Sequence, residues 1–116
     1  MQIEGFTRWL KGHFGRGSQS VTDMLDDCAR VERVLGDLDN LYDNDRFRSA
    51  LAGMVYSADD ERRRHQPPVG FEVTPCNDRN LYCRRIRQVM SSLRTSVRRY
   101  RDFRDGVDPA LPSRRG

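Results

Sequence analysis

The strongest constraint on the fold is a long amphipathic pattern over residues 80–104. Apolar side chains recur there every three or four residues, which is the period of one face of an α-helix. They are Tyr82, Ile86, Met90, Leu93, Val97 and Tyr100. A second line with the same spacing lies roughly a quarter turn further round the helix and consists of Arg84, Arg87, Ser91, Arg94, Arg98 and Arg101. The pattern predicts one long helix with an apolar side toward the core and an arginine-lined side, here called the arginine rail, toward an anionic partner.

Three shorter helices are predicted before this one. Residues 2–14 place aromatic and aliphatic side chains on one face, and residues 21–35 repeat that pattern between a serine-rich start and Gly36. A third helix is predicted over 46–56, after an acidic, turn-like stretch over 37–44. Helices joined by short turns favour an all-α, four-helix bundle.

A long loop over about residues 57–77 is predicted before the last helix. The charge run 59–64 either extends or follows the third helix, and Pro67-Pro68 excludes helix beyond it. Alternating apolar residues over 69–74 allow a short strand or an extended clip. Phe71 is the one aromatic residue here that could stack on single-stranded nucleic acid.

Chain length indicates one domain, over residues 1–105, followed by a disordered tail over 106–116. Three cysteines, an odd number, argue against a secreted disulfide framework. No apolar run approaches the roughly 18 residues of a membrane span. We therefore expect a cytoplasmic protein that does not enter the membrane.

The charge is unevenly distributed along the chain. Residues 1–60 carry a net charge of −4 and residues 61–116 a net charge of +8. Twenty of the 21 basic residues are Arg, which suits bidentate recognition of phosphate or carboxylate. A genome rich in G and C would produce the same preference for Arg over Lys, but it would not explain the clustering of the arginines.

A second candidate anion site lies at the start of the predicted second helix. Helix N-termini offer free amide groups and a favourable dipole. The polar side chains there that could reach a phosphate or a base are Arg16, Ser18, Gln19, Ser20 and Thr22. The alternative is an ordinary capped turn.

The arginine rail also has a structural alternative. It could be a solvated helix face neutralised by acidic residues of the second helix, either within one chain or across a dimer. The candidates for that pairing are Asp26, Asp27 and Glu32.

No residue pattern indicates catalysis, a metal ion or a cofactor. The spacing of His65, Cys76 and Cys83 fits no zinc motif. The two histidines belong to no recognisable triad or paired-histidine motif. The dense carboxylates Asp39, Asp43 and Asp45, the only group a metal-dependent nuclease could use, lack the calcium-loop pattern. The sequence thus predicts a protein that is not an enzyme.

The order of these parts resembles the SAM-like core-binding domain that precedes the catalytic domain of tyrosine recombinases and phage integrases. Phe6 and Leu10 match the Phe-x-x-x-Leu of that family's first helix, and Ser20-Val21 stands where a Thr-Ile/Val pair is common. The last helix matches through Leu93, Val97, Tyr100 and Phe103. The family's catalytic domain is absent here, and the loop over 57–76 is longer than usual. A similar helical module also stands at the front of restriction-type nucleases.

The resemblance implies a domain that clamps duplex DNA through its second and fourth helices. It carries DNA contact onto Arg16, Ser18, Gln19, Thr22, Arg87, Arg94, Arg98 and Arg101, and the rail pattern adds Arg84. The predicted function is therefore a non-catalytic DNA-binding domain, standing alone or as a module of a recombinase or restriction-type system. The alternative is a protein–protein interaction module, in which charge-complementary halves form a homodimer or bind an acidic protein.

Overall fold

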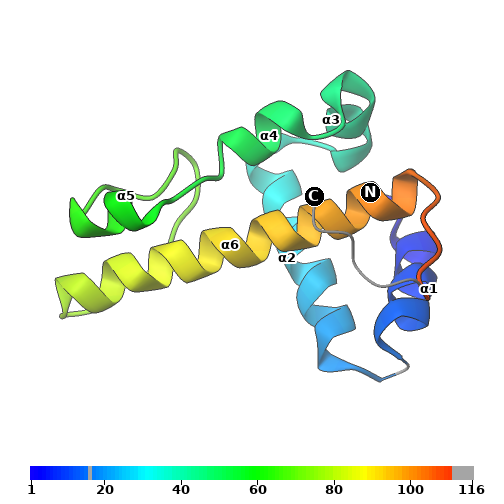
Figure 1. The fold of residues 1–116 in the computed structure, drawn as a ribbon, viewed down its shortest axis with the longest axis horizontal. Coiled ribbons are helices and arrows are strands. Elements are labelled where there is room, and N and C mark those ends of the chain that lie inside the picture. Colours follow the sequence, from blue (N-terminus) through cyan, green and yellow to red (C-terminus); the bar gives the residue numbers. More distant parts are fainter. Residues whose placement is uncertain (16, 111–116) are drawn as a thin grey trace.

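Helix α6 (Arg79–Arg104) runs the length of the molecule, and the other elements are arranged along it (Figure 1). The computed structural model describes residues 1–15 and 17–110. The elements before α6 are α1 (Ile3–Phe14), α2 (Gln19–Leu35), α3 (Leu38–Asp45), α4 (Arg48–Ala52) and α5 (Ala58–Arg62). Helix α2 crosses α6 near its middle, α1 packs against both, and α5 packs against the start of α6. None of the described residues forms a strand.

The amphipathic pattern of α6 is confirmed in the structure. The Asp78 side chain caps the helix by accepting hydrogen bonds from the amides of Asn80 and Leu81, at 2.9 and 3.2 Å. All of the predicted apolar line is buried except Tyr82, which is half-buried. Within residues 1–15 and 17–110, no helix combines the length and the apolar content that crossing a bilayer requires.

Helices α1 and α2 also form where the sequence predicts them. Ser18 accepts a hydrogen bond from the amide of Ser20 at the start of α2, and Gly36 follows its end. Phe6 of α1 is fully buried and makes an edge-to-face contact with Tyr100 of α6, with ring centroids 4.9 Å apart. The all-α class is thus correct.

The region between α2 and α6 differs from the expected four-helix plan. The stretch over 37–44 is not a turn, because Asp37 caps a real helix, α3, whose Leu38 is fully buried. The helix expected over 46–56 exists but is much shorter, because only Arg48–Ala52 is helical. Arg46 and Phe47 have φ values of 54° and 68°, and this left-handed pair separates α3 from the short α4. The described chain therefore has six helices, one of which, α5, lies inside the expected loop.

Residues 65–77 form an extended clip with no strand. Phe71 is only 4% exposed, so the expectation that it could stack on nucleic acid is wrong. Gly70 permits this packing, because its φ is +87° and a Cβ there would lie 2.7 Å from a methyl group of Val34 on α2.

The described part of the expected disordered tail, residues 106–110, folds back onto α1. The Trp9 indole donates a hydrogen bond to the carbonyl of Val107 at 2.7 Å, and His13 Nδ1 lies 2.8 Å from the carbonyl oxygen of Pro109. Ordered packing thus continues beyond Gly106, and residues 111–116 lie outside the described part.

Candidate anion-binding surface

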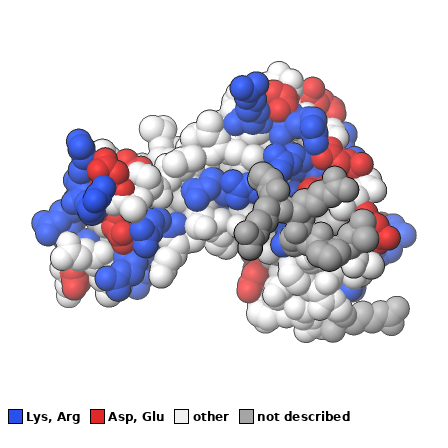
Figure 2. Space-filling view, viewed as in Figure 1, with Lys and Arg blue, Asp and Glu red and all other residues white. Residues whose placement is uncertain are grey.

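The basic charge of the chain is concentrated on α6. From Arg79 to Arg101 this helix contains eight arginines and no Asp or Glu. Figure 2 shows Lys and Arg side chains along the middle of α6 amid uncharged surface, and a second cluster at the end of the molecule that carries α5. Like charges one turn apart destabilise a helix. The stability of α6 therefore does not explain why its arginines are clustered.

The structure divides the arginine rail into free and bound members. Arg84 and Arg98 are exposed, and within the described ranges neither forms a salt bridge. Arg87 pairs with Glu61 of α5 at 3.2 Å. Arg101 is half-buried beside Asp105, whose carboxylate binds Arg46 and Tyr42.

Arg94 is the structural member of the rail. Its Nη1 donates a hydrogen bond to the carbonyl of Met54 at 2.9 Å, which joins α6 to the segment after α4. Burial, together with the nearby charge of Arg98, lowers the pKa of Arg94. A guanidinium nevertheless stays protonated in proteins, and a neutral carbonyl does not cancel its charge.

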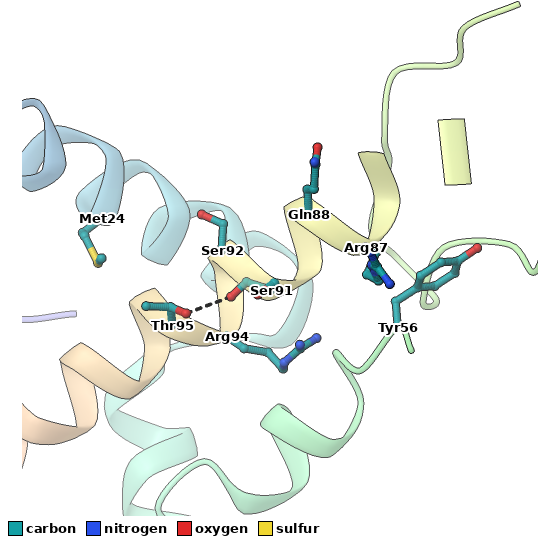
Figure 3. A pocket seen from close by; sticks show the side chains of 8 residues that line it. All are labelled: Met24, Tyr56, Arg87, Gln88, Ser91, Ser92, Arg94 and Thr95. Atoms are coloured by element: carbon teal, nitrogen blue, oxygen red, sulfur yellow. Dashed lines mark hydrogen bonds between the residues drawn. The ribbon is translucent and has the colours of Figure 1, made fainter. Parts of the chain in front are cut away.

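A groove with a volume of about 570 Å³, here called the central groove, follows the exposed side of α6. Its lining residues are Met24, Tyr56, Arg87, Gln88, Ser91, Ser92, Arg94 and Thr95. In Figure 3, Arg87 and Arg94 lie on the side that carries Tyr56, Met24 lies on the other, and Ser91 and Thr95 lie between them. Two cations beside short hydroxyl and amide side chains can bind the oxygen atoms of a phosphate backbone.

A second groove, here called the terminal groove, has a volume of about 490 Å³ and lies between α5 and the start of α6. It is lined by Glu61, Arg62, Arg64, Asn80, Arg84 and Arg87. The sequence analysis missed the contribution of Arg62 and Arg64, which it treated only as part of a charge run. A detectable signal was Ser57-x-x-Asp60, which forms a capping box and starts α5 immediately before these arginines.

The predicted anion-binding residues at the start of α2 that the structure describes line neither groove, although Met24, further along α2, lines the central groove. Ser18 is occupied as the helix cap, Gln19 donates a hydrogen bond to Asp23 at 3.1 Å, and Thr22 is exposed. Arg16 lies outside the described residues. The structure therefore brings Arg84, Arg87 and Arg94 of α6 to the two grooves, whereas Arg98 and Arg101, like the described candidates of α2, line neither.

The acidic residues of α2 do not pair with the rail. Asp27 instead accepts hydrogen bonds from the hydroxyls of Ser92 and Ser96, both at 2.8 Å, and Ser92 lies at the edge of the central groove that α2 forms with α6. Glu32 lies 2.9 Å from the ammonium group of Met1. The rail is instead partly neutralised by Glu61 of α5, which pairs with Arg87, and by Asp105, which lies near Arg101.

The dense carboxylates of α3 are also occupied. Asp39 and Asp43 both bind the guanidinium of Arg104, and Asp45 accepts hydrogen bonds from Ser49. Among the residues that the structure describes, no three His, Cys, Asp or Glu side chains gather closely enough to hold a metal ion. These carboxylates link elements of the fold.

No protein-family model matches this chain, and no curated protein and no solved structure matches it either. The likeness to the recombinase core-binding domain therefore stays a prediction.

Proposed function

We propose that this chain is a non-catalytic nucleic-acid-binding domain that holds the phosphate backbone of duplex DNA along the exposed side of α6. The observation that carries the proposal is the acid-free, arginine-rich surface of α6 around the central groove. Phosphate contacts by Arg and Lys supply most of the sequence-independent affinity of DNA-binding proteins.

The dimensions of the rail fit several backbone contacts. Arg84 and Arg98 are fourteen residues apart, which corresponds to about 21 Å along a helix. Phosphates of one DNA strand rise by only about 3.4 Å each along the duplex axis, so a rail of this length is long enough for more than one phosphate contact before the strand winds away from it. Ser91 and Thr95 lie between the arginines and are short enough to donate to phosphates or base edges.

Repulsion between neighbouring arginines of α6 supports the same interpretation. The rail places Arg84 and Arg87, Arg94 and Arg98, and Arg98 and Arg101 one turn apart. Each such like-charge pair destabilises an isolated helix by about 0.2–0.5 kcal/mol. Bound phosphates would convert this repulsion into attraction.

The test is duplex binding measured by fluorescence anisotropy over a range of salt concentrations. Arg84→Gln/Arg98→Gln removes two exposed charges without touching the buried Arg94. We expect about tenfold weaker binding. The slope of log K against the logarithm of the salt concentration should become shallower by about two, because two phosphate contacts are lost.

The matched control is Arg8→Gln/Arg33→Gln, which removes the same charge from exposed residues of α1 and α2 that line neither groove. Equal affinities for wild type, the rail variant and this control would refute the proposal. Light scattering at low salt tests the alternative module, since a salt-sensitive dimer without DNA affinity would favour it.

A further inference from the structure

The terminal groove gathers four arginines, from α5, from the turn after it and from α6, beside the carboxylate of Glu61. Arg62, Arg64, Arg84 and Arg87 share its lining with Glu61. Arg62 also pairs with Asp59 of α5 at 3.0 Å, so four positive charges lie beside two negative charges. The side chain of Glu61 is only 21% exposed and reaches Arg87 at 3.2 Å. Within the described residues, Arg64 and Arg84 form no salt bridge, so guanidinium groups outnumber the carboxylates around the groove.

The backbone around the groove is fixed by contacts that do not use up these charges. The buried Tyr56 hydroxyl donates to the carbonyl of His65 at 2.7 Å and lies 3.3 Å from that of Asp60. Arg64 ends this turn in a left-handed conformation, with φ at 54°, and its guanidinium reaches Asn80 of α6 at 3.1 Å. The end of α5 is thus held against the start of α6.

The guanidinium group of Arg79 also joins α6 to the turn after α5. Its Nη2 donates to the carbonyl of Arg64 at 3.1 Å. This contact and that of Arg64 with Asn80 are to neutral oxygens, so both guanidinium charges remain available to an anion. Because these donors are already held in place, less side-chain entropy is lost when an anion binds.

We propose that the terminal groove binds a phosphate group and that the Glu61 carboxylate occupies the position of that phosphate in the free protein. Carboxylate and phosphate both accept hydrogen bonds from guanidinium groups, and a phosphate oxygen can replace the carboxylate at Arg87. Glu61 is then an internal competitor that weakens binding. The inference rests on the proposed function for the source of the phosphate, the DNA backbone, whereas a free phosphate has the same chemistry.

The sharpest test is Glu61→Gln, which keeps the size of the side chain and removes its charge. We expect about threefold to fivefold tighter binding, because an exposed ion pair is weak and its loss frees Arg87. Glu4→Gln, on the exposed start of α1, removes the same charge far from the groove and serves as the control. The opposite change, Arg62→Gln/Arg64→Gln, should weaken binding at least tenfold relative to Arg8→Gln/Arg33→Gln.

Two probes separate the sources of the phosphate. Inorganic pyrophosphate is titrated into each variant by calorimetry, with NMR of the arginine Nε–Hε groups to locate the contact, and duplex DNA is titrated by anisotropy. Arg62→Gln alone repeats the test without disturbing the fold, because the Arg62 side chain is 75% exposed. Melting curves confirm that each variant is folded.

The possible results are distinct. If both probes follow the expected order, the inference and the proposed function stand together. If pyrophosphate follows it while no variant binds DNA, the groove is a phosphate site and the proposed function falls. If wild type binds DNA through Arg98 but neither Glu61→Gln nor the Arg62 variants change the affinity for either probe, the phosphate site in the terminal groove is refuted and the proposed function remains. Absence of binding to both probes overturns both.

Discussion

Tyr100→Phe tests how the N-terminal segment and α3 hold α6 in place. The Tyr100 ring is 0% exposed, and its hydroxyl accepts a hydrogen bond from the amide of Gln2 at 2.7 Å. The same hydroxyl donates to the carboxylate of Asp39 in α3 at 2.8 Å. Phenylalanine fills the same volume, so the substitution removes these two hydrogen bonds without opening a cavity.

The expected loss follows from these two contacts. A hydrogen bond to a charged group contributes about 1.5–3 kcal/mol, and water can partly replace the contact with Gln2, which is exposed. We therefore expect the free energy of unfolding to fall by about 2 kcal/mol, which lowers the Tm by about 10 °C in a domain of this size. Urea unfolding followed by circular dichroism should show a lower midpoint with an unchanged slope.

Tyr82→Phe is the matched control on the same helix. Tyr82 is half-buried against the core, and its hydroxyl forms no hydrogen bond within the described residues. It should change the free energy of unfolding by less than about 0.5 kcal/mol. If both tyrosine variants unfold at the same urea concentration, the assignment of the Tyr100 hydroxyl as a link between α1, α3 and α6 is wrong.

The pH dependence gives a second measurement of the same link. Burial raises the pKa of Asp39, but the hydrogen bonds from Tyr100 and Arg104 more than offset it, so the net pKa is lowered. A lowered pKa in the folded state stabilises the fold above the unfolded value of about 3.9, and this contribution is lost as the pH falls through the folded value. The difference in Tm between wild type and Tyr100→Phe should therefore be smaller at low pH than at pH 7. A difference that stays constant would contradict the role of the carboxylate.

Three further changes test other parts of the fold. Gly70→Ala should lower the stability by about 1–3 kcal/mol in urea unfolding, because alanine is strained at positive φ and its methyl group meets α2; an unchanged midpoint would mean that the clip packs differently. Asp78→Ala should cost about 1 kcal/mol by leaving first-turn amides of α6 without their cap, and a neutral result by the same method would exclude the cap. A thiol reagent should modify Cys76 alone in the folded protein, because Cys28 and Cys83 are buried and burial raises the pKa of the Cys28 thiol to about 12. Rapid modification of more than one thiol before urea is added would show that the core opens.

The sequence predicts α6 well because its signal is long and consistent. Six apolar positions repeat at helical spacing, and Asp78 stands immediately before the first turn. A pattern of this length leaves no competing register, so both the helix and its buried side are correct. The shorter helices α1 and α2 follow from the same signal with caps at their ends.

The region over 37–56 could not be predicted in the same way. Arg46 and Phe47 adopt left-handed backbone conformations, which are normally favoured by Gly or Asn and are not indicated by Arg or Phe. Packing of the fully buried Phe47 ring compensates for the strain, and such packing is a tertiary effect. One detectable signal was missed, since Asp37 before Leu38 and Leu41 is a capped apolar start.

The sequence predicts the arginines of α6 as a line along one helix. Which residues of other elements lie beside that line depends on the tertiary structure. Helical spacing places Arg84, Arg87, Arg94 and Arg98 along one flank. Spacing cannot show that α5 brings Arg62 and Arg64 next to the start of that line, because the intervening loop has no periodic signal. The start of α2 was predicted from the general affinity of helix N-termini for anions. That affinity carries no information on whether these residues lie beside the arginines of α6.

The contacts of Arg87 and Arg94 differ in a way that bears directly on binding. Both guanidinium groups are held by other elements, which reduces the entropy lost when an anion binds. The partner of Arg94 is a neutral carbonyl, so its full charge faces the central groove. The partner of Arg87 is a carboxylate, so its charge is cancelled until an incoming anion displaces Glu61. Because Arg87 lines both grooves, a ligand in either groove should respond to Glu61→Gln, whereas only a strand long enough to enter the terminal groove should respond to Arg62→Gln. Comparing short and long duplexes against Arg62→Gln measures how far along α6 the bound strand extends.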